Sequence, residues 1–245
     1  MPFATSRDGV RVHYELDGEG PPLVLQHGTG GSLEMWKARG FVERLRDHYR
    51  LVLVDSRGHG ESDRPSDRAA YALPHRVADI TAILDDAGIE RAHYFGYSMG
   101  GWIGYGMLRH APRRFHSAVI GGFGPVTDPY FGRDPLEMAR GSVERRGVDD
   151  PAEVALLHTI FSETASFEGA EDVVRAVQMP LLLYAGTEDA RHASVKAAAE
   201  LTPLASFFEL PGLDHGEGGG AVDEVVPRVL EFLAAVPMGE GAAAG

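Results

Sequence analysis

The sequence predicts an α/β fold in which a mostly parallel, twisted sheet is covered by helices on both faces. Short, continuous apolar runs recur along the chain, as strands buried on both faces of a parallel sheet require. Segments with apolar residues at helical spacing separate these runs. Alternating strands and helices are typical of parallel sheets, so antiparallel pairing is expected only at the N-terminal start.

Composition narrows the class of protein. The chain has 245 residues, of which 44% are hydrophobic and 24% charged, as in an ordinary globular protein. Its formal net charge of −13 would repel a polyanion, so no nucleic acid partner is expected. The absence of cysteine excludes disulfides, thiolate metal sites and cysteine nucleophiles.

Apolar runs of membrane-spanning length are missing from the sequence. No segment approaches the roughly 20 apolar residues that a span needs, and residues 1–9 carry no signal-peptide core. We therefore expect a cytoplasmic protein without a membrane partner. Abundant Ala and Gly, with Lys37 and Lys196 as the only lysines, indicate a GC-rich bacterial gene, a hypothesis that its base composition would test.

The N-terminal third predicts strand, helix and strand in that order. Residues 10–16 alternate apolar and polar side chains after a turn signal, which indicates a half-exposed strand following a hairpin. Residues 23–26 and 51–55 are continuous and apolar, as buried strands require. Between them, 33–49 has helical spacing that Gly40 interrupts.

The same rhythm continues to the C-terminus. Residues 74–87 predict a helix ended by Gly88, and 92–97 predict the next buried strand. The remaining predicted elements are a helix over 98–110, strands over 117–120, 180–185 and 206–210, and a closing amphipathic helix over 222–236.

One long segment interrupts the rhythm. Residues 125–177 contain no strand-like run, only helical pieces over 136–146, 152–161 and 170–177. We interpret the segment as a helical cap over one end of a core formed by 1–124 and 178–238. The alternative is a surface extension without a role in binding. The Gly- and Ala-rich tail, 239–245, is predicted to be disordered.

A glycine-flanked serine provides the candidate nucleophile. Ser98 lies in the G-x-S-x-G pattern of residues 96–100, between a predicted strand and a predicted helix. That context is the one in which the motif forms a tight elbow that exposes a serine. The alternative is an ordinary Gly-rich turn.

A serine of normal pKa needs a histidine base and a carboxylate that orients it. Working groups in open α/β sheets lie beyond the carboxyl ends of strands, where His215 and Asp189 are expected. The order Ser98, Asp189, His215 is the order of the nucleophile-elbow fold. Glu188 is the alternative acid. His110 and His116 are interpreted as surface or structural residues. The sequence contains no zinc-binding spacing.

Two aligned N–H donors are needed for the developing oxyanion. We expect one from Met99, at the start of the helix that follows the elbow, and one from Thr29 in the glycine-rich loop 27–31. A dinucleotide-binding fingerprint is the rival use of this glycine run. This use is excluded because the G-x-G-x-x-G pattern requires a glycine at its sixth position, and the sixth residue counted from Gly28 is Leu33.

Four motifs in chain order resemble the α/β-hydrolase superfamily: His27-Gly28, the D-x-R-G-x-G-x-S loop of residues 55–62, the elbow and His215. The resemblance spans Phe3 to Val236. It implies a Ser-Asp-His triad, an acyl-enzyme intermediate, no cofactor and a helical cap. Haloalkane dehalogenases and epoxide hydrolases have Asp where this chain has Ser98, which excludes those branches. Small carboxylesterases and enol-lactonases are the most similar branches.

The expected function is hydrolysis of a small-molecule carboxylic ester or lactone. Cofactor-free perhydrolases and carbon–carbon bond hydrolases use the same triad and remain alternatives, as does a ligand sensor of this fold without turnover. Trp36 is expected in the core. Five aromatic residues are expected to line an apolar acyl or aryl pocket, with core packing as the alternative for each: Tyr97, Trp102, Phe123, Tyr130 and Phe161.

Overall fold

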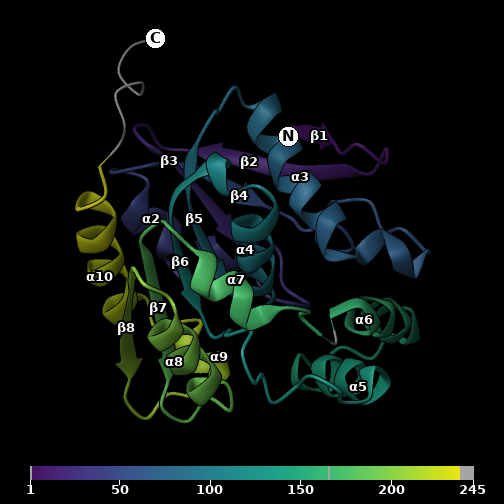
Figure 1. Ribbon diagram of the computed structural model, residues 1–245. Coiled ribbons are helices and arrows are strands. Elements are labelled where there is room, and N and C mark those ends of the chain that lie inside the picture. The colour runs from purple at the N-terminus through teal and green to yellow at the C-terminus, as the bar shows by residue number, and fades with distance from the viewer. Residues whose placement is uncertain (1, 165, 238–245) are drawn as a thin grey trace.

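The computed structural model describes residues 2–164 and 166–237, so the tail predicted at 239–245 lies outside the described residues. Its centre is an eight-stranded sheet in the order β1-β2-β4-β3-β5-β6-β7-β8 (Figure 1). The strands are β1 (Phe3–Thr5), β2 (Arg11–Asp17), β3 (Pro22–Gln26), β4 (Arg50–Val54), β5 (Ala92–Tyr97), β6 (Phe115–Gly121), β7 (Leu181–Gly186) and β8 (Ala205–Leu210).

The pairing directions confirm the predicted fold class. Strand β2 pairs antiparallel with β1 and with β4, and all other neighbours pair parallel. The hairpin between β1 and β2 turns at Gly9, whose φ of +86° is open to glycine without strain. The parallel strands therefore all end at one edge of the sheet.

Helices cover both faces of the sheet (Figure 1). One face carries α1 (Glu34–Ala38), α2 (Phe41–Leu45) and α10 (Val222–Ala234). The other carries α3 (Leu73–Asp86), α4 (Met99–His110), α7 (Ala170–Ala176) and α8 (His192–Leu201). Trp36 lies in the first layer with 1% of its surface exposed, in agreement with its predicted place in the core.

The helix predicted over 33–49 is divided into α1 and α2 at Gly40, whose φ is +82°. The sequence did not indicate β1, α8 or the short helix α9 (His215–Gly218). A three-residue strand is too short for periodicity to reveal, and α9 depends on a capping box in which Asp214 and Glu217 satisfy each other's backbone N–H groups. Two short 3-10 helices, η1 (Arg68–Tyr71) and η2 (Pro112–Arg114), complete the elements.

The segment predicted as a cap holds three helices and no strand among its described residues. Helices α5 (Pro135–Arg145) and α6 (Pro151–Thr164) pack against each other and stand apart from the sheet (Figure 1). They share a small apolar cluster with η1, to which Tyr71 contributes. Helix α7 packs instead against α4 and α8. Only α5 and α6 therefore extend away from the core.

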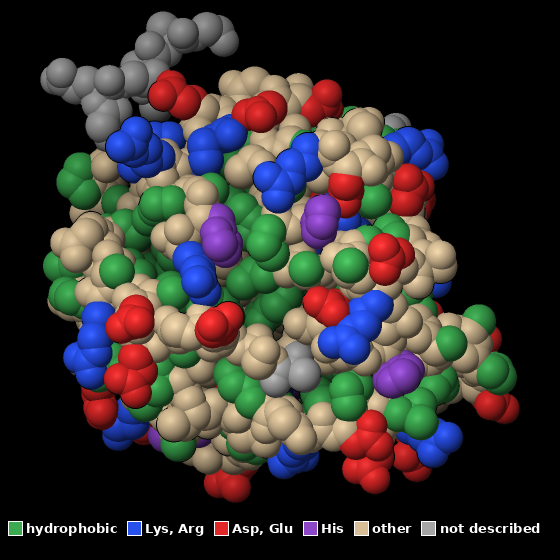
Figure 2. All heavy atoms as spheres, turned by 45° about the vertical axis from the view of Figure 1, so that its right-hand side comes forward, with side chains coloured by type: hydrophobic (Ala, Val, Ile, Leu, Met, Phe, Trp, Pro, Cys, Tyr) green, Lys and Arg blue, Asp and Glu red, His purple; other side chains and the backbone are tan. Residues whose placement is uncertain are grey.

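On the face drawn in Figure 2, acidic and basic side chains are interspersed. None of the helices in the described parts of the chain is long and apolar enough to cross a membrane.

Substitution of Gly100 tests how closely the start of α4 approaches the end of β3. A Cβ on Gly100 would lie 2.1 Å from the carbonyl oxygen of Gln26, a backbone atom that cannot move aside. We expect Gly100→Ala to lower the free energy of unfolding by about 2 kcal/mol or more, measured by urea denaturation.

The matched control is Gly141→Ala in α5, where the nearest contact of the new Cβ is the flexible end of Arg145. This change should be neutral or stabilising by up to about 1 kcal/mol, because alanine is the better helix former. Equal effects of the two substitutions would contradict the close approach.

Candidate active site

Ser98 lies in a strained turn between β5 and α4. Its φ of 55° and ψ of −112° are unusual for a residue with a Cβ. The turn has room only because its neighbours are glycines: a Cβ on Gly96 would lie 2.4 Å from the carbonyl oxygen of Gly100. The N–H of Ser98 donates to the carbonyl of Gly121 at 2.9 Å, which fixes the turn to β6. The hydroxyl is thereby presented at the carboxyl edge of the sheet.

His215 and Asp189 meet Ser98 at that edge. The Nε2 atom of His215 lies 3.0 Å from the hydroxyl oxygen of Ser98, and its Nδ1 atom lies 2.7 Å from a carboxylate oxygen of Asp189. Asp189 follows β7, and His215 begins α9 after β8. The structure therefore brings together three residues that the sequence placed in separate loops.

Asp189 is held in its ionised form. Burial raises its pKa, but the hydrogen bond and charge of His215, with the N–H of Arg191, outweigh this, so the pKa lies below its usual value. The N–H of Arg191 donates to the carboxylate at 2.9 Å. Glu188, the alternative acid, lines the cavity beside Ser98, whereas the partner of the His215 Nδ1 atom is Asp189.

A cavity of about 760 Å³ opens above Ser98. Its lining includes both predicted oxyanion residues and four of the five predicted pocket aromatics: Thr29, Met99, Trp102, Phe123, Tyr130 and Phe161. Trp102 comes from α4, and Phe161 comes from α6, so a helix of the sheet layers and a helix of the predicted cap segment both contribute walls.

The prediction that Tyr97 lines the pocket is wrong. Side chains alternate along a strand, and Tyr97 points with Phe95 toward the face that α1, α2 and α10 cover. Its ring packs against His215 with centroids 5.3 Å apart, and its hydroxyl donates to the His215 carbonyl at 2.5 Å. Tyr97 therefore supports His215 from behind.

Arginines in the cavity wall were missed by the sequence analysis. Arg191 pairs with Asp128 at 2.7 Å, and its guanidinium lies 4.0 Å from the ring centroid of Tyr130. Arg133 lies 4.3 Å from the same ring. Arg146, which follows α5, donates to the carbonyl of Gly30 at 2.9 Å. The contacts of Arg191 and Arg146 join segments far apart in the chain, so no local pattern could have revealed them.

His27 fixes one peptide of the loop beside Ser98. The carbonyl of Gly28 accepts hydrogen bonds from the His27 Nδ1–H at 2.7 Å and from the Gly31 N–H at 3.1 Å. In a trans peptide the C=O and the following N–H point in opposite directions. Holding the Gly28 carbonyl therefore also sets the direction of the Thr29 N–H.

His59, from the D-x-R-G-x-G-x-S loop, holds the next peptide. The N–H of Gly30 donates to His59 Nε2 at 3.0 Å, and His59 Nδ1 lies 3.2 Å from the carbonyl of Arg57. Burial lowers the pKa of both His27 and His59, and the nearby Arg76 charge adds to the effect. Each neutral ring keeps one acceptor and one donor nitrogen, which this arrangement requires.

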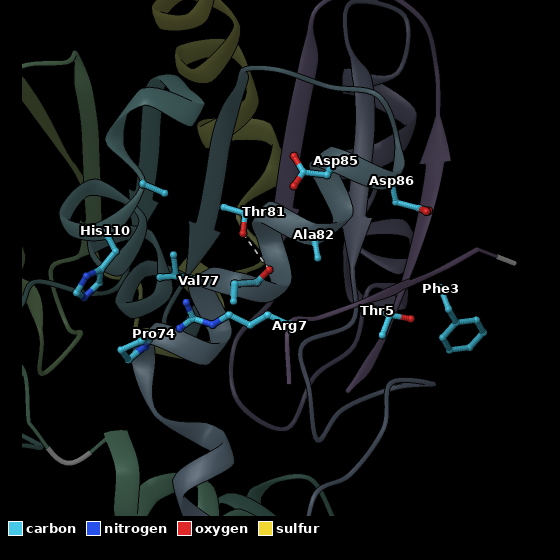
Figure 3. A pocket seen from close by; sticks show the side chains of 12 residues that line it. Phe3, Thr5, Arg7, Pro74, Val77, Thr81, Ala82, Asp85, Asp86 and His110 are labelled. Atoms are coloured by element: carbon cyan, nitrogen blue, oxygen red, sulfur yellow. Dashed lines mark hydrogen bonds between the residues drawn. The ribbon is translucent and has the colours of Figure 1, made fainter. Parts of the chain in front are cut away.

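A second cavity, of about 770 Å³, lies beside α3 near the N-terminus (Figure 3). Its wall includes Thr5, Arg7, Asp85 and His110. None of the predicted site residues lines it. His110 ends α4 here, away from Ser98, in agreement with its interpretation as a surface or structural residue.

Residues 21–172 match the family model described as "alpha/beta hydrolase fold". The chain belongs to the α/β-hydrolase fold family. Across almost its whole length, this α/β-hydrolase is 25% identical to a non-heme haloperoxidase of Rhodococcus erythropolis, with 95% of this chain and 99% of the relative covered. It is 31% identical to 3-oxoadipate enol-lactonase 2 of Acinetobacter baylyi over 47% of this chain and 42% of the relative.

Solved structures resemble the α/β-hydrolase over almost its full length. A thermophilic esterase from Thermogutta terrifontis superposes with a TM-score of 0.80 at 21% identity, covering 95% of this chain and 97% of that one. An esterase from Rhodococcus sp. ECU1013 gives 0.71 at 26% identity, covering 96% and 99%. The matches to several curated relatives are shorter, with the chain spanning about half of their length, 43% and 51% in two cases.

The neutral state of His59 predicts how stability depends on pH. The unfolded residue binds a proton below about pH 6.5, whereas the folded residue, with its lowered pKa, stays neutral. The unfolded state then carries more protons, so the free energy of unfolding falls as pH drops below about 6.5, by about 1.4 kcal/mol per pH unit for each such residue.

His59→Gln removes this titration and keeps an acceptor for Gly30. Between pH 7 and pH 5, we expect its free energy of unfolding to fall on average about 1 kcal/mol per pH unit less steeply than that of the wild type, measured by urea denaturation. His158→Gln, which removes an exposed imidazole of α6, is the control. Identical slopes for His59→Gln and wild type would refute a neutral His59.

Proposed function

We propose that this α/β-hydrolase cleaves a carboxylic ester or lactone through an acyl-enzyme intermediate. The observation that carries the proposal is the pair of hydrogen bonds that joins Ser98 and His215, which line the cavity, to Asp189. A nucleophile, a base within hydrogen-bond reach and a group that orients the base form the constellation that acyl transfer uses.

The first step is attack on the substrate carbonyl. The Nε2 atom of His215 takes the Ser98 proton as the serine oxygen bonds to the carbonyl carbon. Asp189 accepts a hydrogen bond from Nδ1–H, which leaves Nε2 free to act as the base and stabilises the imidazolium that forms. The carbonyl oxygen becomes an oxyanion.

In this mechanism the backbone N–H groups of Met99 and Thr29 bind that oxyanion. Met99 begins α4, where the helix dipole favours negative charge. Thr29 lies in the loop whose Gly28 approaches Ser98 so closely that a Cβ there would lie 3.3 Å from the Ser98 Cβ. Preorganised donors of this kind stabilise the transition state more than the ground state.

The second half of the reaction releases the products. Imidazolium His215 gives its proton to the leaving alcohol oxygen as the tetrahedral intermediate collapses to the acyl-enzyme. Water then attacks the acyl carbon while His215 accepts a water proton, and that proton returns to Ser98 as the carboxylic acid leaves. For a lactone, the alcohol and the acid belong to one product.

The lining of the cavity and the relatives both support an ester or lactone substrate. Trp102, Phe123 and Phe161 supply apolar surface for an acyl or aryl group. The solved structures that resemble the chain include proteins named as esterases and an enol-lactonase from Burkholderia xenovorans LB400, the latter with a TM-score of 0.77 at 24% identity.

Ser98→Ala tests the nucleophile. We expect the substitution to lower kcat for p-nitrophenyl acetate by about five orders of magnitude, because the remaining triad residues have no oxygen to activate. Ser142→Ala, which alters another serine of the same cavity, should change kcat less than threefold. A Ser98→Ala variant that retains wild-type turnover would contradict the assignment.

Asp189→Asn tests the orientation of the base. The amide can donate to His215 and favour the wrong tautomer, so kcat should fall by about 10⁴ with little change in KM. Glu188→Gln is the matched control, since it alters the neighbouring acid and should leave kcat within about threefold. A larger loss for Glu188→Gln than for Asp189→Asn would transfer the role to Glu188.

Fluorophosphonate labelling separates this function from the alternatives. Labelling of Ser98 with steady-state ester turnover supports the proposal. Labelling without turnover of any ester or lactone indicates a sensor, and turnover confined to vinylogous diketo acids indicates carbon–carbon bond hydrolysis.

A further inference from the structure

A buried arginine lies directly behind the candidate active site. Arg76 belongs to α3, which packs against α4, and only 1% of its surface is exposed. Within the described residues, its Nη2 atom has no hydrogen-bond partner and no carboxylate forms a salt bridge with it. A buried guanidinium without such a partner is costly to keep, and costly buried charges concentrate at functional sites.

The nearest acid on the same helix is already engaged. Both carboxylate oxygens of Asp79 accept hydrogen bonds from Arg57, at 2.7 and 2.5 Å. Burial lowers the pKa of Arg76 to about 10, and the Arg57 charge acts in the same direction. Arg76 therefore remains protonated at neutral pH and holds a fixed positive charge in the protein interior.

One nitrogen of Arg76 contacts the supports of both predicted oxyanion donors. Its Nη1 atom donates to the Ser56 hydroxyl at 2.7 Å and lies 3.5 Å from the sulfur of Met99. The N–H of Ser56 in turn donates to His27 Nε2 at 3.1 Å, and His27 holds the Gly28 carbonyl that sets the direction of the Thr29 N–H. Met99 carries the other donor.

The cavity wall separates Arg76 from any substrate. Its guanidinium lies 5.9 Å from the ring centroid of Trp102, a lining residue, and 5.4 Å from that of Tyr71. Its Nε atom donates to the Tyr71 carbonyl at 3.2 Å. Arg76 can therefore act only through the residues that it holds and through its charge.

We propose that Arg76 is a positioning residue of the oxyanion hole, which aligns the Met99 and Thr29 donors from behind and supplies a fixed positive charge that favours the oxyanion. This inference rests on the proposed function. It assigns to α3, an element outside the triad and the elbow, a part in transition-state stabilisation.

A positioning role and a packing role of Arg76 differ in their effects on kcat and KM. Negative charge develops on the substrate oxygen only on the way to the tetrahedral intermediate, so an interaction with that charge lowers the barrier without strengthening ground-state binding. Loss of Arg76 should therefore lower kcat and leave KM nearly unchanged. A packing role alone would not depend on the charge of the side chain.

Arg76→Gln and Arg76→Lys form the test pair. Glutamine retains hydrogen-bonding capacity without charge, and lysine retains the charge. With p-nitrophenyl acetate, we expect Arg76→Gln to lower kcat by 10- to 100-fold and to leave KM within about twofold of the wild-type value. For Arg76→Lys, the decrease in log kcat should be smaller than that of Arg76→Gln by at least about a third. Equal losses in both variants, or no loss in either, would overturn the proposal.

Thermal unfolding midpoints and a matched control exclude a general loss of stability. Tyr14→Phe removes the part-buried hydrogen bond at 2.7 Å from the Tyr14 hydroxyl to Asp86, at the far end of the same helix. It should lower the unfolding midpoint while kcat stays within about twofold. If kcat follows the midpoint across all three variants, Arg76 is only a structural anchor.

The rate of fluorophosphonate labelling keeps this test separate from the proposed function. Phosphonylation of Ser98 also places a developing negative oxygen in the hole, so Arg76→Gln should slow labelling by a similar factor. If wild type labels but hydrolyses no ester or lactone, the proposed function fails and the labelling rates alone decide the role of Arg76. If wild type neither labels nor hydrolyses, both proposals are overturned.

Discussion

The candidate active site depends on the fact that β5, β7 and β8 run in the same direction. Each of these strands ends at one edge of the sheet, and each is followed by a residue of the Ser98, Asp189 and His215 set. Ser98 and His215 are 117 residues apart in sequence, yet their reactive atoms lie within 3.0 Å. Reversal of one strand would carry its residue to the opposite edge. Parallel pairing is thus the constraint on which the geometry of the site rests.

A second layer of polar groups lies beneath this edge, and its protonation states fit one another. Neutral His27 and His59 each accept one backbone N–H and donate to one backbone carbonyl, which holds the peptides on both sides of Thr29. Asp189 stays ionised because His215 and the Arg191 N–H offset the cost of its burial. The D-x-R-G-x-G-x-S loop acquires a physical role in this setting, because its Ser56 and His59 support the loop that faces the nucleophile.

Much of the fold could be predicted because its signals are local. Buried strands such as β5 and β7 read as continuous apolar runs, and the elbow at Ser98 needs glycines that are visible in the sequence. Ser98 followed from its G-x-S-x-G pattern, and Asp189 and His215 followed from their places after predicted strands. Tyr97 is next to the elbow in sequence, but strand alternation turns its ring away from the cavity, to the face that it shares with Phe95. The alternation of Tyr94, Phe95 and Tyr97 along β5 is a local signal that indicates this direction.

The sequence by itself determined the alternation of buried strands and helices, their order, and which side chains are chemically able to act, since propensity, periodicity and turn chemistry depend on neighbours along the chain. Only the tertiary structure decided that Asp189 rather than Glu188 contacts His215, that Arg145 and Arg146 line the cavity, and that Arg76 contacts Ser56 and Met99. These outcomes depend on contacts between segments far apart in the chain, which only the folded arrangement brings together.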